Sequence, residues 1–223
     1  MKRYQSTLNK FTVYCAHRSG SNFLQTLITD NYIDCEAVEN SRESIDWKHG
    51  LYHSNYKNNK KFNIVMARHP IKWVNSCIRF NADMWKWWNV NGTEPPYFVY
   101  KNRPVSIPKM ISKWNRFYSE WLYKSDCKFV WFADLLRDEP RKKILQRIAI
   151  ENNLVERSSN IEVASHVQHS EPFTEEKRQR EFDIETNDML NDTIVDYINN
   201  NVDNNLLNLM MSMSYEDCSS IQR

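Results

Sequence analysis

The sequence predicts an α/β fold: a P-loop-like, doubly wound domain in which a central parallel sheet is flanked by helices. Three short apolar runs of strand-forming residues carry this prediction, at 11–16, 62–67 and 128–132. A segment with helical spacing of apolar residues follows each run, and this alternation is typical of parallel strands joined by crossover helices. With 223 residues the chain suffices for one such domain, so we expect a single domain over 1–223.

Apolar periodicity and start signals predict five helices. They are expected after the turn at 17–22, after Pro70, at about 109–124, from Asp138-Glu139-Pro140, and at about 186–200. Asp138 is expected to cap its helix, with Pro140 in the first turn. Between about 152 and 185 the sequence is polar and irregular, which predicts a long loop.

Composition narrows the classes of function. The net charge of +2 argues against a nucleic-acid binder, whose basic surface is larger. The chain has no apolar run approaching the roughly 20 residues of a membrane span. Its five cysteines are scattered and odd in number, which favours reduced thiols in a cytoplasmic protein.

The first candidate site is the turn HRSGSN at 17–22, between a predicted strand and a predicted helix. A nucleoside-triphosphate P-loop needs two glycines and a lysine, and this turn has one glycine and no lysine. What it offers an anion is the N–H groups of Ser19, Gly20, Ser21 and Asn22, two serine hydroxyls, and the Arg18 cation. Taken alone, the stretch is also explained as a plain strand–helix connection.

A second candidate site begins where the second predicted strand ends. Arg68 stands at that end, and Ser76 lies in the helix that follows Pro70. Ligands of parallel sheets bind at the carboxyl ends of the strands, where an arginine can hold a phosphate through two hydrogen bonds. Two anion sites on neighbouring strands suit a nucleotide phosphorylated at both ends, which ATP is not.

Taken together, these motifs resemble those of the sulfotransferases that use 3′-phosphoadenosine 5′-phosphosulfate (PAPS). HRSGSNFL at 17–24 resembles their 5′-phosphosulfate loop, and ARHPIKWVNS at 67–76 resembles their 3′-phosphate motif. FVWFADLLRDEPRKKILQRI at 129–148 resembles a third family segment, so that the likeness covers about 12–148. The chain departs from the family pattern at His17, where a proline is usual, at Asn22, and at Ala133.

The resemblance implies transfer of the sulfuryl group of PAPS to a hydroxyl or amine of a small-molecule or carbohydrate acceptor, by metal-free in-line displacement. Arg18 is expected to stabilise the bridging oxygen, because charge grows there as the bond to sulfur breaks. The acceptor needs a base, and WKHGLYHS at 47–54 offers His49, with Lys48 as a further cation and His53 as the competing base. The two histidines have no evident third ligand, so no metal site is expected.

An aromatic segment at about 81–107 is the candidate acceptor loop. Trp85, Trp88 and Tyr97 are expected to bind the acceptor, since aromatic faces stack on sugar and phenol rings. A hydrophobic lid over the core is the plainer interpretation of the same residues.

Two other classes of protein fit the same motifs. One is a nucleotide or small-molecule kinase with a degenerate phosphate loop, in which Asp134 would help to hold Mg²⁺. The other is a non-catalytic nucleotide-binding protein of the same fold.

Overall fold

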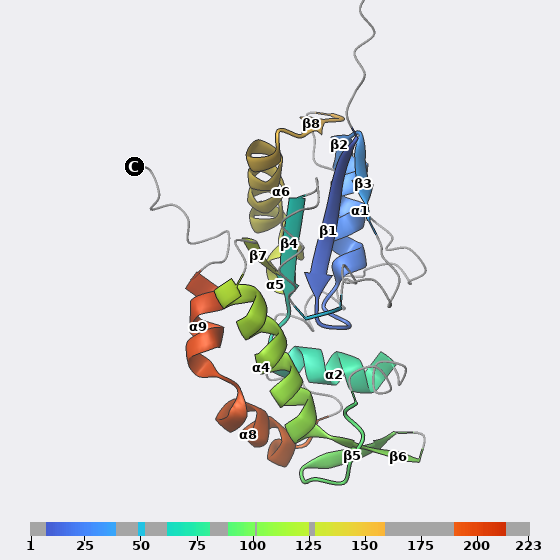
Figure 1. Ribbon diagram of the computed structural model, residues 1–223, viewed down its shortest axis with the longest axis vertical. Helices are drawn as coiled ribbons and strands as arrows, with labels where there is room; N and C mark the ends of the chain where they lie inside the picture. The colour runs from blue at the N-terminus through green and yellow to red at the C-terminus, as the bar shows by residue number, and fades with distance from the viewer. Residues whose placement is uncertain are drawn as a thin grey trace, which may run out of the picture.

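At the centre of the protein lies a parallel sheet of four strands in the order β3-β1-β4-β7 (Figure 1). The strands are β1 (Asn9–Cys15), β3 (Cys35–Ala37), β4 (Phe62–Ala67) and β7 (Lys128–Trp131). This computed structural model describes residues 8–38, 49–51, 62–80, 89–100, 102–124, 128–158 and 190–212. The predicted α/β fold with a central parallel sheet flanked by helices is confirmed.

Both faces of the sheet are buried, because alternate residues of its inner strands enter two different cores. On β1, Phe11, Val13 and Cys15 belong to one core, and Tyr14 belongs to the other. Helices α1 (Ser21–Asn31), α5 (Phe132–Leu135) and α6 (Asp138–Asn152) pack in the first core; α2 (Pro70–Phe80), α4 (Ile107–Lys124), α8 (Asp192–Asn201) and α9 (Asn204–Ser212) pack in the second. Burial on both faces is why the inner strands read as continuous apolar runs.

The strand order reverses between β1 and β4. The next strand of this sheet along the chain, β3, pairs with one edge of β1, and β4 pairs with the other. In open parallel sheets, such a reversal leaves a crevice outside the carboxyl ends of the two strands. The loop after β1 and the residues after β4 therefore meet at the usual position of a ligand site.

The smaller sheets were not predicted. Within the candidate acceptor loop, β5 (Tyr97–Tyr100) and β6 (Arg103–Ser106) form an antiparallel hairpin, so this part of the segment is not an irregular loop. Near the start of the segment predicted as a loop at 152–185, β8 (Val155–Glu156) pairs with β2 (Tyr32–Ile33). Residues 159–185 lie outside the described part.

Two predicted helix starts need correction. Helix α8 begins at Asp192 and not at 186, because the Asn191 side chain accepts a hydrogen bond from the Ile194 amide at 3.0 Å and caps the helix there. Helix α6 begins at Asp138 itself, so Arg137 occupies the cap position and makes no side-chain cap bond. None of the described helices is long and apolar enough to cross a membrane.

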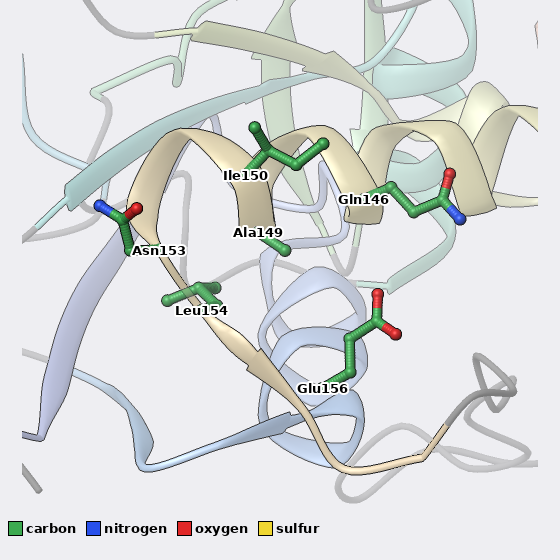
Figure 2. Close-up of a pocket in the computed structure, with 6 residues that line it drawn as sticks. All are labelled: Gln146, Ala149, Ile150, Asn153, Leu154 and Glu156. Carbon is green, nitrogen blue, oxygen red and sulfur yellow. The ribbon is translucent and has the colours of Figure 1, made fainter.

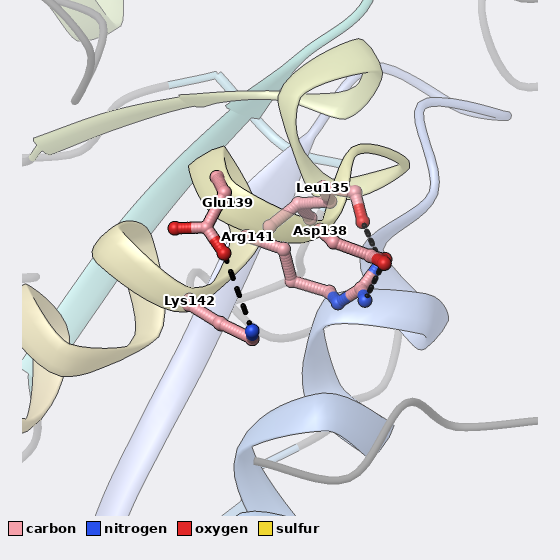
Figure 3. A network of polar contacts seen from close by, with 5 residues as sticks. All are labelled: Leu135, Asp138, Glu139, Arg141 and Lys142. Carbon is pink, nitrogen blue, oxygen red and sulfur yellow. Dashed lines mark hydrogen bonds and ion pairs between the residues drawn. The ribbon is translucent and has the colours of Figure 1, made fainter.

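One arginine of α6 is almost completely buried. Arg141 is 1% exposed, and it donates from Nη1 to the Leu135 carbonyl at 3.2 Å and from Nη2 to Asp138 Oδ1 at 2.5 Å (Figure 3). It thereby joins α5 to the first turn of α6. Lys142 next to it pairs with Glu139 at 3.3 Å, but both of these side chains are exposed.

We expect Arg141→Ala to lower the free energy of unfolding by about 1–3 kcal/mol, because it leaves a buried carbonyl without its donor and removes packed methylenes. Lys142→Ala is the matched control, and it should change stability by less than about 0.5 kcal/mol, since exposed ion pairs contribute little. Urea unfolding of both variants measures the difference. Equal losses would show that burial of Arg141 does not stabilise the fold.

Candidate active site

The loop between β1 and α1 has a left-handed backbone at two positions. Arg18 has φ 65°, and Gly20, which precedes the first helical residue Ser21, has φ 90°. The amide N–H groups of Gly20 and Ser21 donate to no residue that the structure describes. The first turn of an eleven-residue helix thus offers backbone donors at the sheet's carboxyl edge, the arrangement that binds anions.

Gly20 is required by its surroundings as well as by its backbone. A Cβ atom at this position would lie 2.4 Å from Phe132 Cδ2, well inside van der Waals contact. Phe132 is 6% exposed and packs in the core beneath α1. The loop therefore rests directly on an aromatic ring of the segment that follows β7.

Gly20→Ala should destabilise the protein by about 1–3 kcal/mol, because the new methyl group must displace the Phe132 ring while the backbone keeps a left-handed φ. Gly92→Ala is the control, since a Cβ there would lie 3.1 Å from the flexible Lys109 Nζ and in ordinary contact with the Ser106 Cβ at 3.5 Å. Thermal melts of both variants measure the effect. A larger loss for Gly92→Ala than for Gly20→Ala would contradict this account of the loop.

Ser19 holds the loop in place. Its amide donates to the Ala16 carbonyl at 3.2 Å, and its Oγ lies 3.2 Å from the Tyr118 hydroxyl. That hydroxyl donates to the Met66 carbonyl at 3.0 Å, so the Ser19 hydroxyl is the donor to Tyr118. Ser19 therefore donates both its amide proton and its hydroxyl proton to groups of the protein, although both were expected to face an anion.

The two arginines of the predicted anion sites lie together. Arg68 donates from Nη1 to the Arg18 carbonyl at 2.8 Å, and its guanidinium lies 5.1 Å from the centre of the Phe132 ring. The Arg18 residue is exposed overall. Partial burial of its guanidinium nevertheless lowers the pKa of this group, Cys77 raises the pKa, and the Arg68 charge lowers it. The ordinary value is so high that Arg18 stays cationic at neutral pH.

The first turns of α2 lie beside this arginine pair. Cys77 is fully buried and interacts electrostatically with Arg68 and Arg18, although burial still raises the pKa of its thiol. Ser76, the predicted 3′-phosphate ligand, precedes it in α2 and is 7% exposed. Burial, followed by the Lys72 charge, lowers the pKa of His69 to about 4, so His69 adds no positive charge at neutral pH.

His49 lies against the carboxyl end of β1. Its Nδ1 is 2.9 Å from the Cys15 carbonyl and 3.7 Å from the Cys15 Sγ. A carbonyl only accepts, so Nδ1 carries the proton and Nε2 keeps its lone pair. The Trp121 indole donates to the Gly50 carbonyl at 3.3 Å, which ties the same short segment to α4. The structure thus brings His49 to the strand end that Arg18 follows.

Two of the other side chains considered above, Tyr97 and Asp134, lie in the part of the chain that the structure describes. Lys48, His53, Trp85 and Trp88 lie outside the described residues. Tyr97 is 46% exposed on the β5–β6 hairpin, which Figure 1 shows beyond α2 from the sheet edge. The Asp134 carboxylate, considered for Mg²⁺, forms an ion pair with Arg137.

Indole and phenol donors hold the backbone around the site, and the sequence did not reveal this role. Trp73 donates to the His17 carbonyl at 2.6 Å, and Trp114 donates to the Arg68 carbonyl at 3.3 Å. Three of the four donors, Trp114, Tyr118 and Trp121, lie on the buried face of α4. The carbonyls that they contact belong to residues far away along the chain, so the sequence pattern gives no sign of these bonds.

A groove of about 530 Å³ lies elsewhere, at the amino end of the strands. It runs between the last turn of α6 and β8, and Gln146, Ala149, Ile150, Asn153, Leu154 and Glu156 line it (Figure 2). Glu156 is its one ionisable side chain. None of the site residues considered above lies in this groove.

Arg18 and Arg68 give the site two cationic side chains, and His49 adds one imidazole. Among the residues that the structure describes, no group of three or more His, Cys, Asp or Glu side chains is arranged to hold a metal ion. Comparisons with models of protein families, with curated proteins and with solved structures gave no match to this chain.

Proposed function

We propose that the protein is a sulfotransferase with a P-loop-like nucleotide site, which transfers the sulfuryl group of PAPS to a hydroxyl or amine of a small-molecule or carbohydrate acceptor. The observation that carries this proposal is the 2.8 Å hydrogen bond from Arg68 Nη1 to the Arg18 carbonyl. It joins two motifs that are 50 residues apart, each of which was expected to bind one phosphate.

The residues present fit a nucleotide with two anionic ends. Arg18 and the amides of Gly20 and Ser21 would hold the 5′-phosphosulfate at the start of α1. Arg68, whose guanidinium has five N–H donors, would bind a 3′-phosphate beside α2. Ser76 is the second candidate for that phosphate. The left-handed Arg18 is a strained backbone position of the kind that collects at ligand sites.

Two groups of the chain would serve the reaction itself. When bound, the nucleotide supplies a sulfuryl group: its bond to the bridging oxygen breaks while a bond from sulfur to the acceptor atom forms. Arg18 stabilises the negative charge left on the bridging oxygen. His49 accepts the acceptor's proton at Nε2, since its Nδ1 is already protonated and bound to Cys15.

The proposal is tested by incubating the protein with PAPS carrying a labelled sulfuryl group and a panel of phenols, sugars and amines, with and without EDTA. We expect label transfer that EDTA does not change. Phosphoryl transfer from ATP that EDTA abolishes, without label transfer from PAPS, would indicate the kinase. Nucleotide binding without any transfer would indicate the non-catalytic protein. Either result would overturn the proposal.

Arg68→Ala should weaken the binding of adenosine 3′,5′-bisphosphate by about 10- to 150-fold, because a charged hydrogen bond contributes about 1.5–3 kcal/mol. AMP, which has no 3′-phosphate, should lose much less. Calorimetric titration of both ligands gives the two ratios, and Arg147→Ala, at an exposed i,i+4 ion pair of α6, is the control. Equal losses for the two ligands would mean that Arg68 acts only on the shape of the loop.

A further inference from the structure

We infer that His17 is a positioning residue for the base His49. The two imidazole rings are stacked, with centroids 3.8 Å apart and planes inclined by 22°. His17 stands before the anion loop and His49 lies 32 residues later, so the fold alone brings them together. The kinetic part of this inference rests on the proposed function, whereas the contact and its effect on the ring do not.

His17 is itself held in place. Its carbonyl accepts a hydrogen bond of 2.6 Å from the Trp73 indole of α2. Trp73 is fully buried, and His17 is half-buried between the end of β1 and the loop. The ring that His17 presents to His49 is therefore attached to a backbone fixed from the core.

The stack supplies a restraint that the hydrogen bond of His49 lacks. The bond from Nδ1 to the Cys15 carbonyl sets the tautomer only while that contact is kept, and a single hydrogen bond does not stop a ring from turning away from its acceptor. A flat ring at 3.8 Å restricts this rotation and so fixes the direction of Nε2 at the opposite edge. A misplacement of about 1 Å at a reacting group can lower a rate by about 10²-fold, so this restraint matters for a base.

A thiol lies beside the stacked pair, and a cationic residue follows His17 in the chain. On β1 the Cys15 thiol lies 3.7 Å from His49 Nδ1, and Arg18 follows His17 directly in the loop. Tyr118 of α4 interacts with Cys15 and is held protonated by burial, which raises the pKa of its phenol. The proposed role uses the neutral form of His49, in which Nε2 has a lone pair.

The test compares His17→Phe, which keeps a flat ring, with His17→Ala and His17→Gln, which do not. The full-length chain is labelled with ¹⁵N-histidine, and long-range proton–nitrogen spectra report which ring nitrogen of His49 carries the proton, with His49→Ala used for assignment. In the wild type and in His17→Phe we expect two well-separated shifts, with the proton on Nδ1. In His17→Ala and His17→Gln we expect the two shifts to move toward each other as the ring leaves the Cys15 carbonyl.

A kinetic comparison measures the consequence. In His17→Ala, kcat for a weakly acidic acceptor should fall on the order of 10- to 100-fold, while an acidic phenol is little affected and His17→Phe keeps most of the activity. Leu51→Ala, in the segment of His49 but 39% exposed, is the control for general disturbance and should resemble the wild type.

The two kinds of measurement separate two failures. If no variant turns over PAPS, the proposed function fails, and the spectra still decide whether His17 orients His49. If the shifts of His49 are the same in wild type, His17→Ala and His17→Gln, the positioning role is refuted whatever the activity. Equal kcat losses in His17→Phe and His17→Ala would also refute it.

Discussion

His49→Ala should lower turnover of weakly acidic acceptors by about 10²–10⁴-fold and leave an acidic phenol nearly unchanged. Only an acceptor of high pKa needs help in losing its proton, and general-base catalysis is worth that much. Nε2 of His49, opposite the Nδ1 that donates to the Cys15 carbonyl, is the group whose loss is measured. The experiment is a comparison of kcat for the two acceptors in wild type and variant.

Leu51→Ala is again the control for His49→Ala, because it alters the same segment without removing a base. If His49→Ala slows both acceptors equally, or neither, the base lies elsewhere. His53 is then the next residue to replace.

Arg18→Ala should lower kcat by about 10²–10³-fold for every acceptor, including the acidic phenol. Arg18 is expected to stabilise the bridging oxygen of the leaving nucleotide. The loss of one donor that stabilises transition-state charge typically lowers kcat by about this factor. Because the charge on the bridging oxygen forms whatever the acceptor is, the effect should not depend on acceptor acidity. Steady-state rates with saturating nucleotide provide the measurement.

Arg116→Ala is the matched control for Arg18→Ala. Arg116 is an exposed arginine of α4 that pairs with Glu120 at 3.0 Å, so its loss should leave kcat unchanged. An effect of Arg18→Ala limited to weakly acidic acceptors would assign Arg18 to the acceptor side. An unchanged kcat would remove Arg18 from catalysis altogether.

The fold was predictable where strands are buried on both faces. Three of the sheet's four strands are continuous apolar runs for this reason. The fourth, β3, has only three residues, and none is fully buried, so it left no apolar run to recognise. The last of the five predicted helices ended at about 200, so α9, which begins at Asn204, was not among them.

The site was predictable only where it depends on strand ends. The expectation that carboxyl ends of parallel strands meet at one edge placed Arg18 and Arg68 together. The contact of His49 with Cys15 and His17 could not be predicted, because it depends on tertiary packing between segments more than 30 residues apart. The hydrogen bond of the Ser19 hydroxyl could not be predicted either, because its partner Tyr118 lies 99 residues away.

The most direct test of the central claim, a site for two phosphates, is the thermal shift of the wild-type protein with adenosine 3′,5′-bisphosphate, AMP and Mg-ATP. A ligand at 100 times its Kd stabilises the native state by about 2.7 kcal/mol, which is ample to detect. We predict that the bisphosphate raises the melting temperature more than AMP at equal concentration, and does so equally in EDTA. Stabilisation by Mg-ATP alone, or equal shifts with AMP and the bisphosphate, would contradict the two-phosphate site.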